Sequence, residues 1–183
     1  MIKKIACPTD FSPAANNAVE YASKLAQRLG AGLTLIHIQH LPVGEGVNLA
    51  SGSDLSTSEE ERLAANSLEV ICNEINTSFQ IPCDFEIIVS MGLFEKVVAD
   101  ELGRFDLTII GTNGADNLFQ FYFGSHSYRM MKNAANPVLI IPEGFTYSDI
   151  RHVVFASEYS GDDLPELQKL KQITDVYQPV LHV

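Results

Sequence analysis

A short apolar run that ends in glycine is the feature that most restricts how this chain can fold. Residues 107–110 read LTII, as expected of a strand that is buried on both faces of a parallel sheet. The run stops at Gly111, Gly114 follows, and after a nine-residue insert Gly124 and Ser125 open a stretch that reads as a helix. This succession of strand, glycine turn, loop and helix is typical of a phosphate-holding segment in an α/β protein.

The glycine-rich segment has the chemistry that anion binding requires. Glycines let backbone N–H groups approach an anion closely and adopt positive φ. The unpaired N–H groups and the dipole at a helix start over residues 124–127 would attract an anion without any lysine. A purely structural explanation stays open, because glycine pairs after a strand are common in α/β turns. The GK[ST] ending of the nucleotide loop and the G-x-G-x-x-G spacing are both missing from the sequence.

Strand and helix patterns alternate along the first 142 residues. Ser12 and Pro13 suit the start of a helix that Gly30 ends, and Ser58 with Glu61 forms the capping box of a second helix. The alternation predicts a parallel sheet with helices on both faces and a ligand site at the carboxyl ends of the strands. Strands are expected at residues 2–7, 33–38, 85–89, 107–110 and 138–141.

Composition narrows the class of protein. The 183 residues carry a net charge of −11, which opposes nucleic-acid binding, and contain no apolar run that could span a bilayer. The start of the chain has no signal-peptide pattern, so a cytoplasmic protein without a membrane partner is expected.

The histidines form no metal-binding pattern, and we expect no metal site. The cysteines are widely spaced and favour buried, reduced thiols: Cys7, Cys72 and Cys83.

The end of the sequence repeats its beginning. Residues 150–160 (IRHVVFASEYS) align without a gap with residues 2–12 (IKKIACPTDFS), and VLHV at 180–183 matches LIHI at 35–38 with three residues fewer in between. The repeat predicts one domain over 1–145 and the truncated start of a second over 150–183. Two strands and a helix cannot bury a core of their own, so this segment is expected to pack on the first domain or on a neighbouring chain. A truncated sequence and a simple C-terminal tail remain alternatives.

The spacing G-x2-G-x9-G-[ST], matched by Gly111, Gly114, Gly124 and Ser125, resembles that of the universal stress protein family. ATP-binding members of this family carry the pattern after their fourth strand. The resemblance covers residues 2–142 as a whole domain, and the repeat implies a tandem-type member. It implies an open, doubly wound, five-stranded parallel sheet of order 3-2-1-4-5, like that of the adenine-nucleotide α-hydrolases. The topological switch then lies between the first and fourth strands.

The resemblance also implies a role for each residue of a nucleotide site. The adenine and ribose side is formed by Asp10, by the wall residues Pro8 and Thr9, and by the backbone at Ile38. Asp10 could instead be a turn residue, and His37, inside a strand, is interpreted as a core histidine. His126 is bulkier than the small apolar residue expected there, so it could strengthen phosphate binding or crowd it. The ribose and phosphate side is formed by Gly111, Gly114, Gly124, Ser125, His126 and Ser127, although Ser125 could be only an N-cap and Ser127 could cap the helix.

Three functions remain open at the level of sequence. The first is a stress-response or signalling module that binds ATP, with Mg²⁺ as a possible companion held by phosphate oxygens. The second is a dimerisation or partner-binding module of the same fold without nucleotide. The third, a slow ATP hydrolase, has the least support because no general base or activated nucleophile can be assigned, and no catalytic residue is proposed. Family members associate through their fifth strands, so a homodimer through the edge strand Val138–Ile141 is expected.

Overall fold

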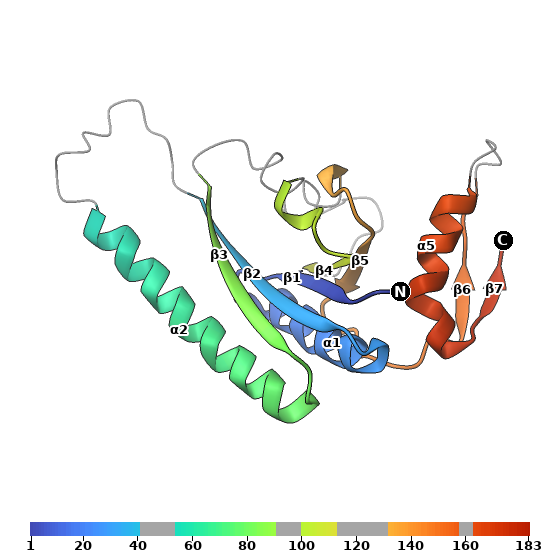
Figure 1. The fold of residues 1–183 in the computed structure, drawn as a ribbon, viewed down its shortest axis with the longest axis horizontal. Coiled ribbons are helices and arrows are strands. Elements are labelled where there is room, and N and C mark those ends of the chain that lie inside the picture. Colours follow the sequence, from blue (N-terminus) through green and yellow to red (C-terminus); the bar gives the residue numbers. More distant parts are fainter. Residues whose placement is uncertain (41–53, 91–99, 113–131, 158–162) are drawn as a thin grey trace.

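Five parallel strands form the centre of the computed structural model, which describes residues 1–40, 54–90, 100–112, 132–157 and 163–183. Their order across the sheet is β3-β2-β1-β4-β5 (Figure 1), which confirms the predicted open α/β sheet and its 3-2-1-4-5 order. All four neighbouring pairs run parallel. The strands are β1 (Lys4–Pro8), β2 (Gly32–His40), β3 (Cys83–Ser90), β4 (Leu107–Thr112) and β5 (Val138–Pro142).

Helix α1 (Pro13–Leu29) begins and ends where its sequence predicts. The Ser12 hydroxyl accepts a hydrogen bond from the Ala15 amide at 3.3 Å, and Pro13 occupies the first helical position. Gly30 ends the helix with a left-handed backbone (φ 63°), a conformation that costs glycine little. The buried side chains of α1 are mostly alanine, which lets the helix lie close to the sheet.

Helix α2 (Asp54–Phe79) begins four residues before the predicted capping residue Ser58, so the capping-box prediction is wrong. The sequence before Ser58 reads DLST, and three of these four residues are also of the types that begin helices. The capping pattern therefore could not single out one starting residue.

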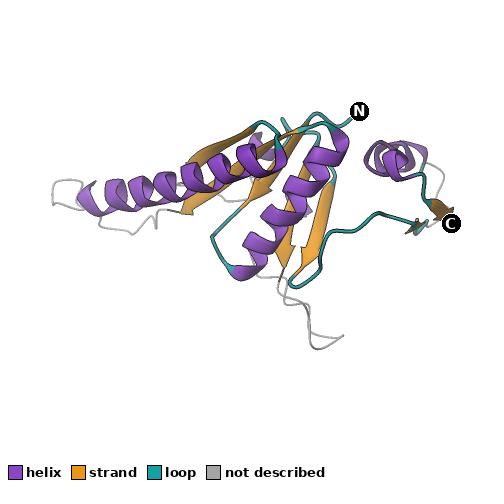
Figure 2. Ribbon diagram, turned by 90° about the horizontal axis from the view of Figure 1, so that it is seen from below, coloured by secondary structure: helices purple, strands orange, loops and turns teal. Residues whose placement is uncertain are grey.

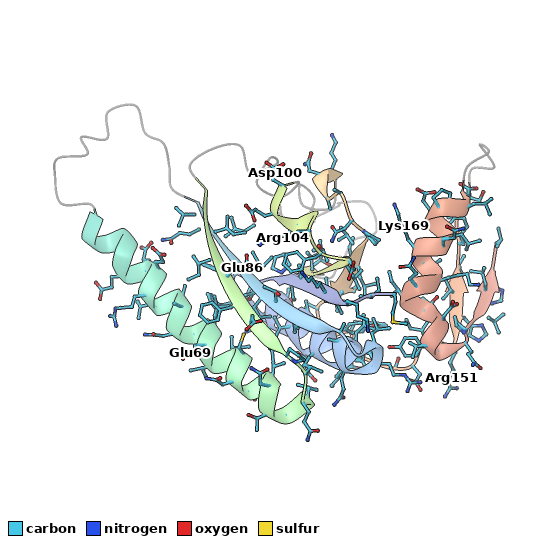
Figure 3. All side chains as sticks on the ribbon, viewed as in Figure 1. Glu69, Glu86, Asp100, Arg104, Arg151 and Lys169 are labelled. Atoms are coloured by element: carbon cyan, nitrogen blue, oxygen red, sulfur yellow. The ribbon has the colours of Figure 1, made fainter. Side chains whose placement is uncertain are left out.

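Two apolar clusters cover the two faces of the sheet. The larger one joins α1 and α2 to alternate residues of the strands, such as Ile5 and Cys7 of β1, and Figure 2 shows both helices over one face. The smaller cluster lies on the other face, where the segment 100–102 is helical and Leu102 packs with Ala6. Helices therefore cover both faces, as predicted. Arg104 pairs with Glu86 of β3, and the two lie close together in Figure 3.

The C-terminal segment forms a small strand–helix–strand unit. It consists of β6 (His152–Val154), α5 (Leu164–Thr174), a 3-10 turn at Asp175–Tyr177 and β7 (Val180–His182), which pairs in parallel with β6. The unit contacts the rest of the chain through α5 and the 3-10 turn. The Met1 amino group donates to Gln172 at 3.1 Å, the Tyr147 and Tyr177 hydroxyls lie 2.6 Å apart, and Ile173 belongs to the larger core cluster.

The register of this unit favours a different alignment of the two segments. Val180 pairs with His152, just as Gly32 pairs with Lys4, so the same 28 residues separate the two partners in each case. If the two segments are aligned by this register, residues 180–183 take the places of 32–35, without the three-residue deletion that the match to 35–38 requires. A four-residue apolar match cannot fix register, because neighbouring positions of buried strands have similar compositions.

Within the described ranges, none of the helices combines the length and hydrophobicity that a bilayer crossing requires.

Candidate functional site

The carboxyl ends of β1 and β4 lie side by side at one edge of the sheet. Ile5 pairs with Leu107 and Ala6 with Thr108, so the strands bring the loop at Thr9 next to Gly111. The chain leaves β1 toward β2 on one side, and β4 is followed by β5 on the other. This is the topological switch, where open α/β sheets form a crevice for ligands.

Thr9 is held in place by the neighbouring strand β2. Its amide donates to the Ile36 carbonyl at 2.8 Å, its hydroxyl accepts from the Phe11 amide at 3.1 Å, and its side chain is buried. The carbonyl of Thr9 lies 2.9 Å from Nδ1 of His37. Since a carbonyl can only accept, this contact requires a proton on Nδ1 of His37.

His37 of β2 has a hydrogen-bond partner and a ring contact, as a structural histidine would. It is half-buried, not a fully buried core histidine, and its ring packs on Phe11 with centroids 5.0 Å apart. The ring therefore ties the β1–α1 loop to the end of β2.

Asp10 is exposed at this edge, and its carboxylate accepts a hydrogen bond from the Ser12 amide at 3.0 Å. Partial burial opposes ionisation of Asp10, but hydrogen bonds from the Ser12 side chain and from backbone amides, with His37 nearby, bring the pKa of this carboxyl below its usual value. Phe11, which follows, has a left-handed backbone (φ 63°). Asp10 thus has a role in the turn, and its carboxylate is ionised at neutral pH.

Position 111 requires a glycine because the backbones of β4 and α1 approach each other closely there. A Cβ atom at this position would lie 2.2 Å from the Ala14 carbonyl oxygen in the first turn of α1. Gly111 is not among the residues with positive φ. The glycine therefore allows α1 to pack against β4, a structural role that the phosphate interpretation did not include.

Five of the ten predicted site residues lie together at this edge. Pro8 ends β1 opposite Ile36, and Ile38 lies two residues further along β2, where it pairs with Ile88. The strand register places Pro8, Thr9, Asp10, Ile38 and Gly111 at this end of the sheet, and their role as a binding site stays a prediction. Five others lie outside the described residues: Gly114, Gly124, Ser125, His126 and Ser127.

Metal coordination by side chains has no support in the described part of the chain. No group of three or more His, Cys, Asp or Glu side chains there is arranged to hold a metal ion.

Comparison with known proteins identifies relatives over most of the chain. Residues 1–142 match the family model described as universal stress protein family. The universal stress protein Slr1230 from Synechocystis sp. is 26% identical over 200 aligned positions, which cover 100% of this chain and 69% of the relative.

Solved structures share the fold. A universal stress protein family protein from Arabidopsis thaliana, At3g01520, solved with AMP bound, matches with a TM-score of 0.54 and 19% identity, covering 77% of this chain and 92% of that one. A universal stress protein from Archaeoglobus fulgidus DSM 4304 matches with a TM-score of 0.63 and 15% identity, covering 98% of this chain and 76% of that one.

Proposed function

Since the family model matches residues 1–142, this chain belongs to the universal stress protein family, and we propose that it binds ATP at the carboxyl ends of β1 and β4 as a stress-response or signalling module. The observation that carries the proposal is the meeting of the Thr9–Asp10 loop with Gly111 at the topological switch. The G-x2-G-x9-G-S spacing that starts at Gly111 supports it, as does the AMP bound to the Arabidopsis relative.

The described residues suit the nucleoside part of such a ligand. The Asp10 carboxylate is an ionised acceptor of the kind that ribose hydroxyls bind, and the contact of His37 with the Thr9 carbonyl fixes the loop beside it. Backbone groups near Ile38 would border the adenine. In this proposal the phosphates lie at residues 124–127, and a Mg²⁺ ion would be held by phosphate oxygens and water.

A partner-binding module without nucleotide is the second candidate function. The outermost strand β5 favours it. β5 is an outermost strand of the sheet, and its residues Val138, Leu139 and Ile140 are only partly buried. An apolar strand edge of this kind favours pairing with another chain, and a homodimer through Val138–Ile141 would cover it. Pairing of two chains through β5 would not exclude nucleotide binding, because the nucleotide is proposed to lie at the carboxyl ends of β1 and β4 and not along the outer side of β5.

We further propose that residues 150–183 are the beginning of a second copy of the domain at 1–145. The register supports this, because the Val180 amide donates to the Arg151 carbonyl at 2.9 Å, as the Gly32 amide does to the Lys3 carbonyl. The match of the Archaeoglobus structure over 98% of this chain supports it as well.

The experiment that tests nucleotide binding is a search for ligand retained by the purified protein. Denaturation and chromatography of the supernatant are expected to release an adenine nucleotide, and ATP added to stripped protein is expected to raise its melting temperature. No released nucleotide together with an unchanged melting temperature would leave the partner-binding module as the function. ATP turnover abolished by Asp10→Asn would instead support the hydrolase.

A further inference from the structure

Two thiols lie against each other between α2 and β3. The Cys83 thiol donates to the sulfur of Cys72, with the two Sγ atoms 3.2 Å apart, and neither residue is in a disulfide. A disulfide bond is about 2.05 Å long, so the two sulfurs would have to move closer by roughly 1 Å to form one. The sequence did not indicate this contact, because the two cysteines are separated by ten residues and belong to different elements.

Asn76 holds the two elements in this alignment. Its side chain amide donates to the Cys83 carbonyl at 3.2 Å, and its side chain oxygen accepts from the Cys83 amide at 2.8 Å. Asn76 lies one helical turn after Cys72 on the same face of α2. The double hydrogen bond therefore fixes the start of β3 against the helix at the level of the two thiols.

The contact also makes the two sulfurs chemically different. Donation from Cys83 lowers the pKa of Cys72 in spite of its burial, and the same hydrogen bond raises the pKa of Cys83. The third thiol has no such partner among the described hydrogen bonds, and burial raises the pKa of Cys7 to about 12. Cys72 is thus the thiol best suited to act as a nucleophile.

Cys72 and Cys83 lie at an outermost strand of the sheet and not at its centre. β3 is an outermost strand of the sheet, and Cys83 is its first residue. Cys72 and Cys83 are 4% and 5% exposed, whereas Cys7 in β1 is fully buried. Local opening at an edge strand requires less free energy than global unfolding, so a small oxidant can reach this pair before it reaches Cys7.

We propose that Cys72 and Cys83 are an oxidation site at which hydrogen peroxide forms an intramolecular disulfide between α2 and β3. The Cys72 thiolate attacks one peroxide oxygen, the O–O bond breaks, and the other oxygen leaves as hydroxide and is protonated to water. The Cys83 sulfur then attacks the resulting sulfenic acid, the S–O bond breaks, and its hydroxyl leaves with the Cys83 proton as a second water. Two electrons pass from the sulfurs to peroxide, so the step balances. The site does not depend on nucleotide binding.

The disulfide would close a short loop and hold α2 against the sheet edge. A disulfide that closes a short loop stabilises a protein mainly by restricting the unfolded chain. For a protein of this length, the stabilisation corresponds to a rise in melting temperature of roughly 5–10 °C. Reduction would reverse the rise. The native contacts of Asn76 would be retained in both forms.

The test is a thiol count on the full chain before and after peroxide treatment. Wild type and Cys7→Ala are each expected to lose two thiols, to give a linked peptide pair containing residues 72 and 83, and to melt at a higher temperature until dithiothreitol is added. Cys72→Ser and Cys83→Ser are expected to form no intramolecular crosslink and to show no rise. Cys7→Ala is the matched control, because it removes the thiol that is outside the pair.

Three results would overturn the proposal. One is retention of all three thiols by folded wild type while free cysteine in the same solution is oxidised. The second is crosslinking only between different chains. The third is an oxidation rate that follows global unfolding when urea is added, since that would show that the native contact gives no advantage. Cys72→Ala and Cys83→Ala replace either serine variant if it fails to fold.

Discussion

Replacing Gly111 with alanine is expected to destabilise the protein by about 3 kcal/mol or more, although the change adds a single methyl group. The added Cβ would meet the backbone carbonyl of Ala14 at 2.2 Å, and a backbone atom cannot rotate away as a side chain can. Either α1 moves away from β4 or the strand distorts. The melting temperature should fall by roughly 6–12 °C, which urea unfolding and calorimetry would both detect.

Gly32→Ala provides the matched control. Gly32 also lies in a central strand, but a Cβ there meets its nearest atom, the Pro82 carbonyl oxygen, at 3.7 Å, an ordinary contact. This variant should differ from wild type by less than about 1 kcal/mol. If Gly111→Ala and Gly32→Ala unfold at the same urea concentration, the close approach of α1 to β4 is not a determinant of stability.

Gly124→Val is expected to weaken ATP binding by about 100-fold or more while leaving the protein folded. In the proposed site the amides at 124–127 bind the phosphates, and each hydrogen bond to a charged group contributes about 1.5–3 kcal/mol, so the loss of two accounts for the effect. Titration calorimetry with ATP measures it. Gly32→Ala again serves as control. Gly32 is the first residue of β2, so it lies at the amino ends of the strands, away from the carboxyl ends where the nucleotide is proposed to bind.

Equal ATP affinity of Gly124→Val and wild type would refute the assignment of the glycine segment to the phosphates. Loss of affinity in both Gly124→Val and Gly32→Ala would indicate that overall stability, not the site, limits binding. The expected pattern is a selective loss at Gly124.

Sequence reasoning was most successful where the physical signal is local. Ser12 and Gly30 act at the two ends of α1 as predicted, because their effect depends on the nearest turn of backbone only. The strand order came from the family resemblance and not from periodicity, since the apolar pattern of a strand does not identify its neighbours.

The remaining features depend on tertiary contacts that no local pattern contains. Gly111 was identified as important, but its structural reason, the carbonyl of Ala14, belongs to another element. His37 was interpreted as a core histidine because it lies inside a strand, and its partner, the Thr9 carbonyl, is 28 residues away in the sequence. The Cys72–Cys83 contact depends on how α2 lies on β3, which a count of cysteines cannot predict.

A crystal structure of the protein soaked with ATP and Mg²⁺ is the most direct measurement of where a nucleotide binds. The nucleoside is expected beside Thr9, Asp10 and the end of β2, with the phosphates extending past Gly111 to the amides of residues 124–127. A nucleotide bound at any other place on the chain, or no nucleotide at the carboxyl ends of β1 and β4 at saturating ATP, would contradict this placement.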